Sequence, residues 1–74
     1  MEHFYINFYR DENGNKVKGN WKLSEEECDA EKDSHLYKVK LGLRWYQTAS
    51  ISKAKVDEIA EKHNMSVAEV LECV

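Results

Sequence analysis

The sequence predicts an α+β domain: a three-stranded antiparallel sheet followed by a C-terminal αα-hairpin packed on one face of it. Three observations lead to this prediction. Two early stretches alternate between apolar and polar residues around an Asn-Gly dipeptide, residues 36–46 alternate again, and the last third of the chain has apolar residues at helical spacing. Strands that precede the helices, rather than alternating with them, indicate an α+β arrangement.

The length of 74 residues predicts a single domain over 1–74, with a sheet in 3–46, an acidic insert at 24–34 and a helical hairpin in 52–74. A chain this short buries only about 60% of the surface that it exposes when unfolded. It therefore has little room for a deep substrate cavity. No catalytic motif and no phosphate-cradling glycine loop occurs, so we expect a protein that is not an enzyme.

The two cysteines, Cys28 and Cys73, do not form a CxxC pair or the cysteine framework of a small secreted domain. The first residues, MEHFYINFYR, lack the basic and apolar regions of a signal peptide, and no stretch approaches the length of a membrane span. We therefore expect a cytoplasmic protein without a membrane partner.

The first two strands are expected at residues 4–9 and 16–23, joined by a turn at Asn13-Gly14. This dipeptide tolerates the positive φ angles that close a tight hairpin. Gly19 interrupts the second alternation, which suggests a bulge or a close contact there. The third strand is expected at residues 36–46, the longest alternation of the chain, with residues 47–51 as a connector.

Between the second and third strands lies an acidic segment, residues 24–33, with six acidic residues and one lysine. Ser24 followed by Glu27 fits a capping box at a helix start. The segment has few apolar residues, so we expect a short helical turn or a mobile loop.

Two helices are expected at the C-terminus, the first over residues 52–63. Asn64 can adopt the left-handed conformation that ends it, and Ser66 with Glu69 forms the capping box of the second. Met65 can pack onto Val70 in front of that helix. The predicted core combines one face of each strand with these helix faces: Phe4, Ile6, Phe8, Val17, Trp21, Leu23, Val39, Leu41, Leu43, Trp45, Val56, Ile59, Val67, Val70 and Leu71.

The outward face of the sheet is the candidate functional surface. With the apolar residues inside, six basic side chains and three tyrosines share the outer face. They are Lys16, Lys18, Lys22, Lys38, Lys40, Arg44, Tyr5, Tyr9 and Tyr46. Cations bind backbone phosphates and aromatic rings stack on unpaired bases, so this pattern favours a regulatory module that binds DNA or RNA. Exposed sheet faces are also lysine-rich because charge blocks edge pairing, which is the structural alternative.

The alternative function is a protein-binding adaptor or inhibitor that docks on a basic protein partner. Its contact residues are the acids of the insert: Glu25, Glu26, Glu27, Asp29, Glu31 and Asp33. We expect no cofactor, and no metal site, because Cys28, His35, His63 and Cys73 lack the short spacings of structural zinc ligands.

The C-terminal residues 56–74 resemble the core of helix-turn-helix repressors, with Ala60, Asn64, Met65, Ser66 and Val70 at the motif's structural positions. The resemblance covers about a quarter of the chain. Asn64 stands where that family usually has glycine, and the second helix carries acidic residues and no basic one. An acidic helix in the major groove would meet phosphate repulsion, so we interpret the segment as a structural hairpin.

Three strands followed by a helix, with the hairpin FYRDENGNKV, also resemble the arm-type DNA-binding domains of tyrosine integrases. The resemblance lies in the order of elements and the turn chemistry, and the acidic insert is not part of that pattern. It implies DNA contact through the exposed face of a three-stranded sheet.

Overall fold

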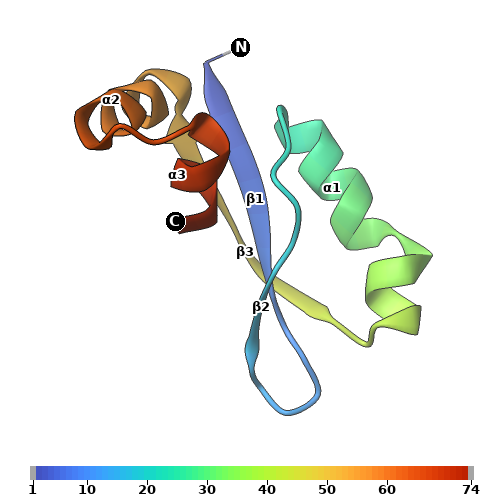
Figure 1. Ribbon diagram of the computed structural model, residues 1–74. Helices are drawn as coiled ribbons and strands as arrows, with labels where there is room; N and C mark the ends of the chain where they lie inside the picture. The colour runs from blue at the N-terminus through green and yellow to red at the C-terminus, as the bar shows by residue number, and fades with distance from the viewer. Residues whose placement is uncertain (1, 74) are drawn as a thin grey trace.

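The computed structural model describes residues 2–73 and has a three-stranded antiparallel sheet with strand order β2-β1-β3 (Figure 1). The strands are β1 (His3–Arg10), β2 (Lys16–Lys18) and β3 (Arg44–Ser52). The helices are α1 (Glu25–Asp33), the π-helical turn η1 (Leu36–Lys40), α2 (Lys53–His63) and α3 (Val67–Cys73). The predicted α+β fold with a C-terminal αα-hairpin on one sheet face is confirmed.

Helices cover both faces of the central strand β1, α1 on one and α2 with α3 on the other (Figure 1). Because side chains alternate along a strand, the even-numbered residues share one face and the odd-numbered residues the other. Phe4 packs with α2 and α3 against Val56 and Val70. Asn7 and Tyr9 instead contact α1 through hydrogen bonds to Cys28 and Glu31.

The prediction of a strand at 36–46 is wrong for its first part, because Leu36–Lys40 is a π-helical turn. It follows α1 directly, with the Lys38 amide donating to the Ser34 carbonyl, and Gly42 at φ 61° follows it. The third strand starts at Arg44 and includes the predicted connector 47–51. Pairing with β1 decides this outcome, since eight residue pairs join the two strands from His3–Ser52 to Arg10–Arg44.

The β1–β2 hairpin forms around the predicted Asn-Gly turn but in a different register. Residues 11–15 form the loop, where the Asp11 carboxylate accepts hydrogen bonds from the Asn13 and Asn15 amides. Lys18 lies opposite Phe8 and Lys16 opposite Arg10, so these lysines share the face of Phe8. The expectation that Lys16 and Lys18 lie on the opposite face from Phe8 is therefore wrong, because the loop length sets the register.

The acidic segment forms a regular helix, α1, rather than an isolated turn or a loop. Ser24 caps it as predicted, accepting a hydrogen bond from the Glu27 amide. One helix face is buried on the sheet through Cys28 and Glu31. Contact with β1 thus supplies the burial that the composition of the segment does not suggest.

Glu31 is the centre of a buried polar network between α1 and β1. Its carboxylate accepts hydrogen bonds from the Tyr9 hydroxyl, Asn7 Nδ2 (3.2 Å) and the Asn20 amide (3.2 Å), and Lys22 Nζ lies 3.6 Å away. A Cβ atom at Gly19 would clash with the Glu31 carboxylate, so the predicted close contact at this glycine is confirmed.

The α2–α3 hairpin follows the predicted pattern. Ser52 caps α2, Asn64 ends it in the left-handed conformation (φ 53°), and Ser66 and Glu69 exchange capping hydrogen bonds. Met65 packs on the cluster that contains Val70. The segment therefore has the local geometry that the sequence predicts.

The predicted core is partly wrong. Ile6, Leu43, Val56 and Val70 are buried as expected. The exposed members of the predicted set are Leu23, Val39, Leu41, Trp45 and Val67. Val39 and Leu41 lie at or beside η1 and Trp45 lies on the edge strand β3, where neighbouring elements cover only part of each side chain. None of the described helices is long and apolar enough to cross a membrane.

Candidate functional site

Three cations stand side by side across the sheet at its hairpin end. Lys16 on β2 and Arg44 on β3 each lie directly opposite Arg10 on β1. Directly paired residues share a face, so the three side chains emerge from the same side of the sheet. All three are exposed. We call Lys16, Arg10 and Arg44 the basic row.

Two aromatic rings lie next to the basic row on the same face. The Arg10 guanidinium lies 4.8 Å from the centre of the Tyr46 ring, and Lys16 Nζ lies 4.8 Å from the centre of the Phe8 ring. The two rings are 6.4 Å apart. The rings therefore hold the two cations in place, since a cation over an aromatic face is attracted by the ring quadrupole.

The basic row is accessible because α2 and α3 cover only the opposite end of this face. Phe4 and Ile51 pack against the helical cluster, and the hairpin end of β1 and β2 extends away from it (Figure 1). At this end β3 has a β-bulge opposite Phe8 and Tyr9, and Tyr46 is its extra residue. Bulges commonly re-aim side chains next to functional sites.

The structure brings together four of the nine side chains predicted for the basic surface, Lys16, Lys18, Arg44 and Tyr46. Tyr9 is buried on the α1 face and cannot reach a ligand, and Tyr5 is half-buried on that face too. Lys22 is also there, paired with Glu31. The single surface expected from the alternation is therefore wrong for these three residues.

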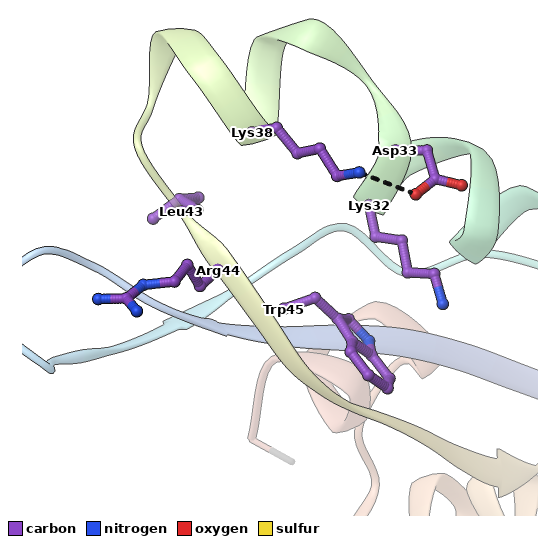
Figure 2. Close-up of a pocket in the computed structure, with 6 residues that line it drawn as sticks. All are labelled: Lys32, Asp33, Lys38, Leu43, Arg44 and Trp45. Carbon is purple, nitrogen blue, oxygen red and sulfur yellow. Dashed lines mark ion pairs between the residues drawn. The ribbon is translucent and has the colours of Figure 1, made fainter.

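The remaining two predicted cations, Lys38 and Lys40, are exposed on η1. Lys38 lines an open pocket of about 540 Å³ where the end of α1, η1 and the start of β3 meet. Its other lining residues are Lys32, Asp33, Leu43, Arg44 and Trp45 (Figure 2). Arg44 thus belongs both to the basic row and to this pocket, which we call the Trp45 pocket.

Trp45 is 43% exposed, although the sequence predicts it in the core. Its indole N–H donates to Thr48 Oγ1 (2.9 Å), and that hydroxyl donates to the buried Asn7 side chain (2.6 Å). Lys32 Nζ lies 4.4 Å from the ring centre. The ring is therefore held in a fixed orientation at the edge of the sheet while much of it stays in contact with solvent.

The acidic residues proposed for a protein partner separate into two groups. Glu31 is buried in the network with Tyr9 and is not available to a partner. The other five are exposed on α1, with Asp29 paired to Lys32 and Asp33 paired to Lys38. Acids in the first turn also stabilise the helix through its dipole, which gives Glu25, Glu26 and Glu27 a structural role.

Sequence reasoning missed Arg10 and Phe8 as surface residues. Phe8 was assigned to the core face with Phe4 and Ile6, and Arg10 lay just outside the predicted strand 4–9, although it continues the same alternation. The available signal was Arg10 itself, because a charged residue at the end of an otherwise apolar face marks the point where cover ends. Lys32 was missed because its segment was considered only for its acids.

Burial raises the pKa of the Cys28 thiol, which disfavours the thiolate that nucleophilic chemistry needs. Within residues 2–73, no group of three histidine, cysteine, aspartate or glutamate side chains is arranged to hold a metal ion. No protein-family model, curated protein or solved structure matches the chain significantly.

Proposed function

We propose that the protein is a small non-catalytic module that binds nucleic acid through the basic row. The observation that carries the proposal is the alignment of Lys16, Arg10 and Arg44 across three strands. With strands about 4.8 Å apart, the row spans roughly 10 Å of surface. Cations at this spacing can neutralise neighbouring phosphates and release their counterions.

Protection against edge pairing does not account for the row. Lys16 and Arg44 lie on edge strands, where charge prevents aggregation, but Arg10 lies on the central strand. Like charges directly opposite each other destabilise a sheet. A row of three cations is therefore a cost to stability that an anionic ligand would offset.

The proposal predicts that Arg10→Gln combined with Lys16→Gln weakens binding and its salt dependence. Binding of a fluorescent oligonucleotide is measured by anisotropy from low to moderate salt. Removing two phosphate contacts should reduce the log–log salt slope by about 1.4 to 1.8. Circular dichroism checks that the variant is folded, because Arg10 also donates to the Gly14 carbonyl.

The matched control is Lys55→Gln with Lys62→Gln, which makes the same charge change on exposed residues of α2. This control should keep the wild-type salt slope. If both double variants reduce the slope equally, binding depends on total charge and the assignment to the basic row is wrong. If the wild-type protein binds neither DNA nor RNA at low salt, the proposed function is wrong.

A further inference from the structure

We propose that the Trp45 pocket holds one unpaired base of a single-stranded nucleic acid, stacked on the Trp45 ring. This inference rests on the proposed function and specifies its ligand. Among the described tryptophan, tyrosine and phenylalanine residues, only Trp45 is exposed, and the others are buried or half-buried. An exposed ring on a rigid strand is a stacking platform, because every base has a flat face.

The charges around the ring suit the flanking phosphates. Lys32, whose Nζ lies over the ring, and Lys38 line the same pocket, with Asp33 as the one acid among the lining residues (Figure 2). Arg44 lines the pocket where β3 begins, but its guanidinium points away from Trp45 (Figure 2). Asp33 and Lys38 form an exposed ion pair with a separation of 3.4 Å. Such pairs contribute little to stability, so Lys38 can exchange Asp33 for a phosphate at low cost.

The pocket is connected to the basic row through consecutive residues of β3. Arg44 and Trp45 project to opposite sides of the strand, as Figure 2 shows. β3 is an edge strand, so no further strand blocks the path from one side to the other. A flexible single strand of nucleic acid can therefore contact the basic row, run past Arg44 around the edge of β3 and place a base on the Trp45 ring.

This route selects single strands over duplexes. Bases in a duplex are stacked on each other and cannot reach a ring beside the backbone, whereas unpaired bases can turn outward. The volume of about 540 Å³ exceeds that of one nucleotide and lies within the usual range for ligand sites, about 300–1,000 Å³.

The test compares Trp45→Ala with the wild-type protein on labelled oligothymidylate and oligouridylate of about twelve nucleotides, and on a duplex of that length. Loss of one stacked base should weaken single-strand binding by about 5- to 150-fold. The preference for single strand over duplex should fall by the same factor. Trp45→Phe should keep most of the affinity, and Val67→Ala, an exposed apolar position on α3, should keep all of it.

A second readout is the pair of indole N–H signals in NMR spectra, which keeps the inference testable if Trp45→Ala is unstable. The Trp45 signal should move when the oligonucleotide is added. The Trp21 signal should stay, because its N–H is bonded to the Leu71 carbonyl (3.1 Å). If the Trp45 signal does not move, the pocket inference is wrong. It is also wrong if Trp45→Ala binds like the wild-type protein while the double variant Arg10→Gln with Lys16→Gln binds more weakly. Both outcomes leave the proposed function intact. Absence of any binding overturns both.

Discussion

A carboxylate buried between a helix and a sheet is costly unless its oxygens are hydrogen-bonded. Glu31, with only 4% of its side chain exposed, meets this condition through Tyr9, Asn7 and the Asn20 amide. The network continues through Asn7 and Thr48 to the indole of Trp45. Individual residues of the interior thus determine how a residue of the proposed site is oriented.

Tyr9 provides a pH-dependent test of this network. Burial, reinforced by the hydrogen bond to Glu31, raises the pKa of the Tyr9 phenol above its ordinary value near 10. The folded state therefore holds its proton more tightly than the unfolded state. This contribution to stability is complete below about pH 10 and is lost as the pH rises toward the folded pKa.

Urea denaturation between about pH 8 and pH 11 should accordingly show stability falling above pH 10, by up to about 1.4 kcal/mol per pH unit for this one proton. Tyr9→Phe should have a shallower decline, although burial also raises the pKa of the Tyr37 phenol and leaves some slope. Parallel declines in the two proteins would show that Tyr9 does not titrate in this way.

At the level of elements, the helix boundaries depend on local capping. Asn64 joins α2 to α3 with a positive φ of 53°, and the Met65 amide donates to the Ala60 carbonyl (2.8 Å). A left-handed residue costs roughly 1–2 kcal/mol when it has an ordinary side chain. Asparagine tolerates the conformation because its short side chain can form local hydrogen bonds.

Asn64→Ala should therefore lower the free energy of unfolding by about 1 kcal/mol, whereas Asn64→Gly should leave it unchanged or raise it. Chemical denaturation measures both variants. Ala54→Gly, an exposed position in α2, is the control for helix propensity and should be destabilising. The explanation from backbone conformation fails if Asn64→Ala is as stable as the wild-type protein.

At the scale of the whole molecule, the cations of the basic row and the acids in the first turn of α1 lie on opposite faces of the sheet. α2 and α3 cover one end of a sheet face, and the basic row lies at the uncovered hairpin end of that same face. α1 carries its acids on the other face. The net charge of −3 is therefore a poor guide to what each surface attracts. At about 0.1 M salt the field of exposed charges decays within about 10 Å, so the local cations dominate a contact at the row.

This separation distinguishes nucleic-acid binding from the adaptor alternative. Glu25→Gln, Glu26→Gln and Glu27→Gln combined should leave oligonucleotide affinity unchanged or raise it a few-fold at low salt. Glutamine also serves in the capping box, so α1 should persist. Anisotropy titrations with the oligonucleotide and with an oligoarginine peptide make the comparison. The adaptor alternative would be favoured if the wild-type protein bound the peptide tightly but not the oligonucleotide, and if the triple variant lost the peptide binding.

The sequence by itself determined the features that depend on neighbouring residues. The Asn-Gly turn, the caps at Ser24 and Ser66, and the left-handed Asn64 each arise within one or two turns of chain. The packing of Phe4, Ile6 and Val56 also follows from periodicity, because these residues lie on the inward faces of the predicted strand and helix and pack inward in the observed ones.

Only the tertiary structure decided which alternating segment became the third strand and which faces were covered. Residues 36–40 alternate well but form the π-helical turn after α1. Residues 44–52, which include the weak strand former Ala49, pair instead along the whole of β1. Cross-strand partners and helix contacts outweigh local propensity, because they bury far more surface than one segment can alone. The same distant contacts cover Tyr9, leave Trp45 exposed and bring Arg10 between two other cations. These positions cannot be inferred from the residues adjacent in the chain.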